Sequence, residues 1–272
     1  MTRTFIYFVL LTALFLGVGY LFGGSKGALM ALLLATIMNF GTYWFSSKFV
    51  LMMYDAKEMK EENFPQIYKV IRNLAMKNAM PMPKIYHINL ASPNAFATGR
   101  DENHAVVGIT SGILELLTED ELKGVLAHEL SHIKNKDMLI STLAASLAGA
   151  LSWLTHFIMF GGGDSENRNP LLSLLLFILT PVLAMLIQLA ISRSREYEAD
   201  RSGAHLIGHG KDLAQALQKI HDFAKQKPLV ATESQAATSH LFIINPFKPS
   251  LLMNLFSTHP PVEERIKRLQ NI

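Results

Sequence analysis

The sequence contains no cysteine among its 272 residues, which excludes disulfide bonds, thiolate metal ligands and a cysteine nucleophile. Charged residues are also scarce, at 17% of the chain against roughly 25% in an ordinary soluble domain. This deficit argues against a fully soluble protein, whereas a hydrophobic content of 50% excludes a disordered chain. The net charge of +3 is too small to indicate nucleic acid as a partner.

The hydrophobic residues are concentrated in four uncharged runs. The first two, 5–22 and 28–45, are separated by a short glycine-rich break, and the other two are 138–160 and 171–191. Each run is close to the ~20 apolar residues that cross ~30 Å of hydrocarbon, so we predict four transmembrane helices. For the last two runs, the alternatives are a hairpin buried in a large soluble core or a re-entrant pair.

Lysine and arginine residues predict how these helices are oriented. In a four-span arrangement Lys26 and Arg168 lie on one side, and the other basic residues near the span ends lie on the opposite side. Because basic residues collect on the cytoplasmic face, we expect both termini and the extramembrane part in the cytosol. The predicted organisation is an N-terminal transmembrane hairpin (1–45), the first half of an extramembrane domain (46–137), a second hairpin (138–191) and the second half of the domain (192–272).

Local patterns within the extramembrane part predict a mixture of helices and short strands. Thr118 and Glu121 fit a capping box, so a helix is expected from about Thr118 to Lys134. Proline residues should end an earlier helix, and runs that alternate with β-branched and aromatic residues indicate strands. The predicted helix is 64–76, and the predicted strands lie in 84–90, 93–100 and 104–110.

The helix that starts near Thr118 carries the strongest chemical signal, His128-Glu129-Leu130-Ser131-His132. Histidines four residues apart lie one above the other on a helix, so both imidazoles can bind one ion. Glu129 is about 100° around the helix, where it can contact a water molecule beside the metal without being a ligand. This is the H-E-x-x-H pattern of zinc hydrolases.

Two histidines are not enough for a catalytic zinc site, which usually has three protein ligands and one open position. Glu196 and Asp200 are four residues apart on a predicted helix and share a face, whereas Glu198 points elsewhere. One of the pair can bind the metal while the other accepts a hydrogen bond from an imidazole. The alternative is a solvated acidic helix paired with neighbouring arginines.

Taken together, the motifs resemble the HtpX membrane zinc metalloproteases, which are related to the CaaX prenyl proteases. The resemblance covers essentially the whole chain and is carried by two N-terminal spans, a second hairpin, and the motifs at 93–99, 128–132, 192–200 and 257–265. It implies an α+β fold, namely a mostly helical zincin-like (gluzincin) domain with a small sheet built on about four transmembrane helices.

The resemblance also implies roles for single residues. Glu196 would be the third ligand of one zinc ion (Zn2+) per chain, and Asp200 would support a zinc histidine. Asn94 would lie near the edge that binds substrate, and His259 and Arg265 would reach the active site. Either of the last two is a candidate second donor, besides zinc, to the developing oxyanion.

The implied function is endopeptidase activity at the cytosolic face of a bacterial inner membrane, with Glu129 as the general base. The implied substrates are misfolded or damaged membrane proteins, as part of quality control and stress response, and the lipid bilayer is the second partner. One alternative is a site-specific processing protease of the prenyl-protein type. Another is a non-catalytic membrane scaffold with structural zinc, which would have no need for Glu129 as a base.

Overall fold

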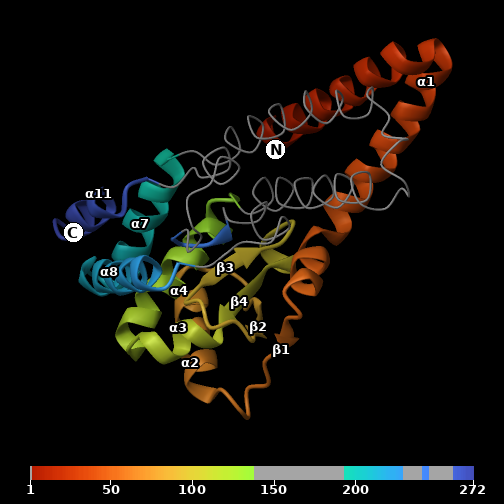
Figure 1. The fold of residues 1–272 in the computed structure, drawn as a ribbon. Coiled ribbons are helices and arrows are strands. Elements are labelled where there is room, and N and C mark those ends of the chain that lie inside the picture. Colours follow the sequence, from red (N-terminus) through yellow and green to blue (C-terminus); the bar gives the residue numbers. More distant parts are fainter. Residues whose placement is uncertain (1, 138–192, 229–240, 245–259) are drawn as a thin grey trace.

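The computed structural model describes residues 2–137, 193–228, 241–244 and 260–272, which form a mostly helical structure with one small sheet (Figure 1). The helices are α1 (Thr2–Met53), α2 (Pro65–Lys77), the 3-10 helix η1 (Glu102–His104), α3 (Ser111–Leu116), α4 (Glu119–Lys134), α7 (Arg193–Ile207), α8 (Lys211–Gln226) and α11 (Val262–Leu269). The strands are β1 (Lys57–Glu58), β2 (Lys84–Ile88), β3 (Ala95–Thr98) and β4 (Val106–Thr110). The predicted mixture of helices with a small sheet is therefore confirmed.

The sheet is mixed, with strand order β1-β2-β4-β3. β2 pairs with β4 in parallel, whereas β1 with β2 and β3 with β4 are antiparallel pairs. β3 thus forms one edge of the sheet, and its residue Ala97 lies opposite Val107 of β4. The three strands predicted from alternating residues are all present, close to their predicted bounds.

α1 differs from the two separate helices predicted for the N-terminal hydrophobic runs. It is assigned as one helix from Thr2 to Met53, although Gly24 has a φ of +56° within it. Glycine adopts such values without the steric cost that a Cβ would impose, so the chain can change direction there without ending the helix. Figure 1 shows α1 turning back at its far end. Within the described part of the chain, no helix is both long and apolar enough to cross a membrane, and the runs 138–160 and 171–191 lie outside the described residues.

α4 is the central helix of the described core. It begins as predicted, because the Thr118 side chain accepts from the Glu121 N–H while the Glu121 carboxylate accepts from the Thr118 N–H at 2.8 Å. Most of its residues are buried, including Val125, Leu126 and Leu130, which are fully enclosed. A helix that is buried nearly all round must have neighbours on several sides. α2, α7, α8 and β3 supply them.

Gly203 allows α7 to approach α4 closely. A Cβ added at Gly203 would lie 2.9 Å from the backbone nitrogen of His128, a distance that real Cβ atoms essentially never show. Seven residues separate Glu196 from Gly203, which is about two helical turns, so both lie on the same face of α7. The close contact at Gly203 therefore brings Glu196 towards the histidines of α4.

We expect Gly203→Ala to destabilise the protein, although alanine normally stabilises a helix by about 1 kcal/mol relative to glycine. The added Cβ must push α7 away from α4, and such overpacking typically costs about 1–3 kcal/mol. Gly41→Ala in α1 is the control, because a Cβ there would meet nothing within 4 Å. The measurement is denaturant unfolding of both variants in mild detergent, and equal stabilisation by both would contradict the close packing of α7 on α4.

Candidate metal centre

His128 and His132 of α4 and Glu196 of α7 lie together where α4 packs against α7, with His128 and Glu196 buried. One possible ligand atom from each of them lies within 4.8 Å of the others. The two imidazole Nε2 atoms are 3.2 Å apart, and the Glu196 carboxylate oxygens lie 3.8 Å from His128 Nε2 and 3.4 Å from His132 Nε2. The three side chains predicted as metal ligands are thus brought to one point.

This arrangement fits one zinc ion. A tetrahedral site with metal–ligand bonds of ~2.0–2.1 Å has ligand atoms about 3.4 Å apart, which is close to the separations of His128, His132 and Glu196. The two Nε2 atoms also face one another. In a hydrogen bond between them, only one Nε2 could carry the proton, and the other would accept it. Two imidazoles and one carboxylate form a donor set that zinc accepts, and together they leave a fourth position open.

Asp200 supports His128 from behind, and Arg265 binds Asp200 while its Nη2 lies 3.4 Å from His128 Nε2. His128 Nδ1 lies 2.9 Å from Asp200 Oδ1, so the ring proton belongs on Nδ1 and the lone pair of Nε2 is available to a metal. The N–H direction is not well aligned for a full hydrogen bond. Burial would raise the pKa of Asp200, but the charge and hydrogen bonds of Arg265, with a smaller effect of His128, lower it to about 2.

Arg265 is fully buried, and its guanidinium group is engaged on several sides. Its Nε and Nη2 donate to the two carboxylate oxygens of Asp200 at 2.8 and 2.7 Å, and its Nη1 lies 3.5 Å from Glu196 Oε2. Burial opposes its charge, yet the facing carboxylates raise the pKa of Arg265 above its already high value. Arg265 therefore reaches the site, as the resemblance implies, but it contacts carboxylates that support and line the metal group. His259, the other candidate donor, lies outside the described residues.

Asp137 and Arg195 support His132, and sequence reasoning missed both. His132 Nδ1 lies 3.4 Å from Asp137 Oδ2, and Asp137 Oδ1 lies 3.4 Å from Arg195 Nε. Burial would lower the pKa of His132, but the hydrogen bond with Asp137 and the charges of Glu196 and Glu129 raise it to about 9. The carboxylates around His132 therefore favour a positive charge at its imidazole. The signal that could have found Asp137 is its position one turn beyond His132, where a carboxylate can reach back to the imidazole.

Glu129 is held between the metal group and the edge of the sheet. It is buried, and its Oε2 accepts a hydrogen bond of 2.9 Å from the backbone N–H of Ala97 in β3. Burial raises the pKa of Glu129, and although the two imidazoles oppose this effect, the charge of Glu196 adds to it. A raised pKa suits a carboxylate that must take up a proton and later release it.

Asn94 directly precedes β3 and is almost completely buried. Its Oδ1 accepts a hydrogen bond of 3.0 Å from the Ile243 N–H, and its own N–H donates to Thr110 Oγ1 at 2.8 Å. The resemblance implies that Asn94 lies near the edge that binds substrate, and the structure places it directly before the edge strand β3. Glu198 is exposed on α7 and points away from the histidines, in contrast to Glu196.

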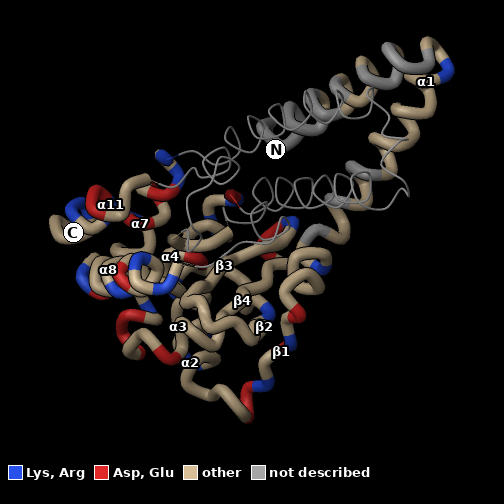
Figure 2. The backbone as a smooth tube through the Cα atoms, viewed as in Figure 1, with Lys and Arg blue, Asp and Glu red and all other residues tan. Residues whose placement is uncertain are grey.

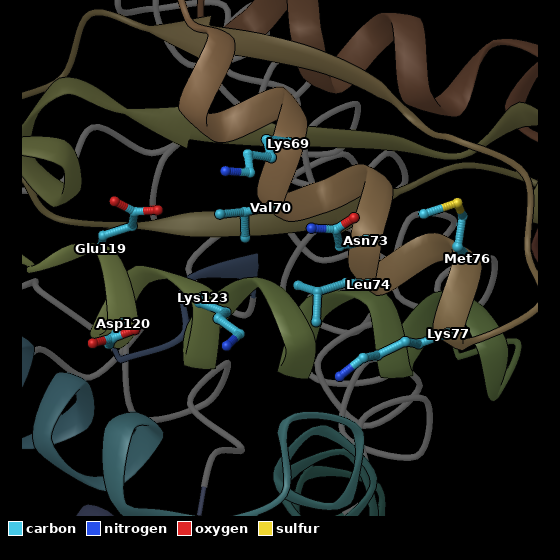
Figure 3. A pocket seen from close by; sticks show the side chains of 9 residues that line it. All are labelled: Lys69, Val70, Asn73, Leu74, Met76, Lys77, Glu119, Asp120 and Lys123. Carbon is cyan, nitrogen blue, oxygen red and sulfur yellow. The ribbon is translucent and has the colours of Figure 1, made fainter.

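A separate hollow lies between α2 and the first turn of α4 (Figure 3). Its volume is about 370 Å³, and it contains both basic and acidic side chains. None of the lining residues belongs to the metal group, so the hollow is not part of that site. They are Lys69, Val70, Asn73, Leu74, Met76, Lys77, Glu119, Asp120 and Lys123.

Comparison with known proteins places these residues in a family context. Residues 61–272 match the profile of peptidase family M48. The chain is 50% identical to "Protease HtpX homolog" of Ralstonia nicotianae and to that of Burkholderia cenocepacia, in each case over 99% of this chain and 96% of the relative. It is also similar to the crystal structure of S. mikatae Ste24p, with a TM-score of 0.51 and 18% identity, over 99% of this chain and 67% of that chain. This last likeness concerns the fold.

We expect Glu196→Ala to remove most of the bound zinc, because two neutral imidazoles leave the charge of the ion uncompensated and its coordination incomplete. Glu198→Ala is the matched control, since it removes an equal charge from the exposed face of the same helix. Zinc content should be measured by mass spectrometry on both variants purified in mild detergent. Retention of stoichiometric zinc by Glu196→Ala, with loss from Glu198→Ala, would show that the ligand assignment is wrong.

Proposed function

Since the chain belongs to peptidase family M48, we propose that it is a membrane-bound zinc endopeptidase. Its membership of the family, shared with the protease relatives, makes it a metalloprotease that hydrolyses polypeptides. The observation that carries the finer assignment is the convergence of His128, His132 and Glu196, with Glu129 beside them. We assign the first three as ligands of one zinc ion and Glu129 as the general base.

Each side chain of the site has a separate role in the proposed reaction. A zinc ion held by the three ligands would polarise the scissile carbonyl and lower the pKa of water. Glu129 accepts the proton of the attacking water and passes it to the leaving amide nitrogen. The hydrogen bond from Ala97 fixes the carboxylate of Glu129 in the orientation that this transfer needs. Asp200 keeps the proton of His128 on Nδ1, so that Nε2 remains a ligand.

β3 is the candidate element for binding an extended substrate. It lies at the edge of the sheet, and backbone groups of alternate residues point away from β4. Ala97 directs its N–H in this way, to Glu129, and Ala95 has the same orientation two residues earlier. A peptide that pairs with this edge would add a strand to the sheet and pass beside Glu129. The backbone pairing explains how such an enzyme can accept many sequences.

The surface of α1 supports attachment to a membrane. α1 contains no acidic residue, and Figure 2 shows no red along its described part. Many of its described apolar side chains are exposed. Leu29, Met30, Ile37 and Phe40 are each more than half exposed. Contiguous apolar surface of this kind marks a face that contacts lipid or another protein. Together with the four hydrophobic runs of the sequence, it supports a multi-pass protein of the bacterial inner membrane.

An aromatic and basic cluster lies where α1 approaches the sheet. The Trp44 ring contacts Phe40 and Tyr43 edge-on, and the guanidinium group of Arg100 lies 4.5 Å from its centroid. Aromatic and basic side chains are typical of the boundary between lipid and water. Arg100 lies two residues after the end of β3, so the C-terminal end of the proposed substrate edge would lie near the membrane surface. This position favours misfolded or damaged membrane proteins as substrates, in a quality-control and stress-response role.

Neither alternative from the sequence is favoured by a specific observation. The likeness to Ste24p shows the fold alone, at 18% identity, so it supplies no evidence for prenylated substrates. A non-catalytic scaffold with structural zinc would leave the buried Glu129 and its hydrogen bond from Ala97 without a purpose. We therefore retain the general endopeptidase as the proposed function.

We expect Glu129→Gln to keep its zinc but to lose activity by about 10²–10⁴-fold, the contribution usual for general acid–base catalysis. The amide preserves the size of the side chain and all three ligands, but it cannot accept the proton. Casein cleavage and zinc content should be measured side by side for wild type and variant. Phenanthroline should abolish wild-type cleavage and added zinc should restore it. Equal cleavage rates at equal zinc content would remove Glu129 from the mechanism.

Topology reporters test the proposed arrangement in the membrane. Because the proposal places the loop around Ser165 outside the cytosol and the C-terminus inside, alkaline phosphatase should be active when fused at Ser165 and inactive at the C-terminus. A green fluorescent protein fused at the same two points should give the opposite pattern. Cytosolic signals from both fusion points, with the protein recovered in the soluble fraction, would contradict the second transmembrane hairpin.

A further inference from the structure

A short segment near the end of the chain, Leu241 to Ile244, is buried beside the metal centre although the sequence indicates no role for it. All four side chains are at most 7% exposed. Ile243 and Ile244 belong to the main hydrophobic core of the extramembrane part, and Leu241 packs in a smaller cluster with Val50 of α1. The segment thus lies against both the extramembrane core and the end of α1, and we refer to it as segment 241–244.

The backbone of Ile243 bridges two parts of the site. Its N–H donates to Oδ1 of Asn94 at 3.0 Å, and its carbonyl oxygen accepts from Arg265 Nη1 at 3.2 Å. Asn94 directly precedes the edge strand β3, whereas Arg265 binds Asp200, which lies behind His128. One residue therefore joins the proposed substrate edge to the carboxylate that orients a metal histidine.

These two hydrogen bonds lie where water cannot replace them. Asn94, Ile243 and Arg265 are 1%, 3% and 0% exposed. If either bond is lost, a buried polar group stays unpaired, which is more costly than losing a bond at the surface. The position of Arg265 is thereby tied to that of Asn94.

The segment is also in contact with α1. The ring of Phe242 lies 6.2 Å from that of Tyr54, just beyond the end of α1, and Tyr54 lies 6.1 Å from Phe96 in β3. Aromatic pairs at such distances stabilise one arrangement of the elements that carry them. Segment 241–244 consequently contacts α1, the edge strand and the support of the metal group.

We propose that segment 241–244 is a positioning element, in which the backbone of Ile243 holds Asn94 at the substrate edge and Arg265 beside the metal group. The part that concerns substrate rests on the proposed endopeptidase activity, whereas the coupling between Asn94 and zinc affinity rests only on the proposed ligand set. Asn94 contacts none of the three metal ligands through a hydrogen bond in the described residues, so any effect of Asn94 on zinc affinity must be transmitted.

Asn94→Ala tests this coupling through two measurements on the purified protein. Hydrogen exchange at the Ile243 amide should become at least about 10-fold faster, because its buried acceptor is gone. Zinc affinity, measured by competition with a chromophoric chelator, should fall by about 10-fold, the lower end of the range for groups that support metal ligands. Asn94→Asp retains an acceptor oxygen and should restore the slow exchange and part of the affinity.

Ile243→Pro removes the same hydrogen bond from the other side and leaves Asn94 in place. It should lower zinc affinity by a similar factor and raise KM for a fluorogenic peptide, and adding Asn94→Ala should cause no further loss of zinc affinity. Ile71→Ala in α2 is the stability control, since it weakens the core without touching the site, and it should leave zinc affinity unchanged.

Two results would overturn the proposal. One is unchanged exchange and unchanged zinc affinity in Asn94→Ala. The other is a loss of zinc affinity in Asn94→Ala with the Ile243 amide still protected, because the effect would then not pass through segment 241–244. Both measurements are independent of proteolysis, so a failure of this proposal is distinguishable from a failure of the proposed endopeptidase function.

Discussion

The balance of charge in one buried volume constrains the rest of the structure. Glu129, Glu196 and Asp200 are each at most 6% exposed, and Arg265 is fully buried among them. Three carboxylates against one guanidinium leave two negative charges when the imidazoles are neutral. Unbalanced buried charge is costly, and groups usually shift their pKa values to reduce it. The raised pKa values of Glu129 and His132 are this response, and a divalent cation would balance the same charge.

The fold supplies the positions that this balance requires. α4 contributes two imidazoles and the candidate base, α7 contributes two carboxylates, and α11 contributes the arginine. α7 can lie this close to α4 because Gly203 of α7 leaves room for the backbone of α4. β3 then approaches from the sheet and binds Glu129 through Ala97. The candidate base is therefore held by the same strand that we propose as the binding edge for a substrate.

Much of the site could be predicted from the sequence, because its signals are local. The capping box at Thr118 and the four-residue spacing of His128 and His132 both act within one helix, so residue types and spacing are sufficient. For the third metal ligand, the four-residue spacing leaves Glu196 and Asp200 as candidates. The family resemblance selects Glu196. The helix and strands of the region from 64 to 110 were likewise found from proline positions and alternation.

The parts that were missed depend on backbone atoms or on the course of the chain beyond the end of a helix. Ile243 acts through its N–H and carbonyl oxygen, which every residue except proline possesses, so no residue type could reveal the bridge to Asn94 and Arg265. Asp137 contacts His132 only because the chain turns after α4, where Lys136 has a φ of +60°. The continuity of α1 through its glycine-rich stretch was not predicted, because glycine residues alone do not show whether a helix ends or only bends there.

We expect the buried carboxylates and Arg265 to arrange His128, His132 and Glu196 around one zinc ion. Anomalous X-ray diffraction at the zinc absorption edge, on crystals of the full-length protein in detergent or lipid, tests this most directly. We expect one anomalous peak per chain, about 2.0–2.2 Å from Nε2 of both histidines and from a carboxylate oxygen of Glu196. A peak bound by other residues, or a fully occupied zinc site with Glu196 turned away, would contradict the account.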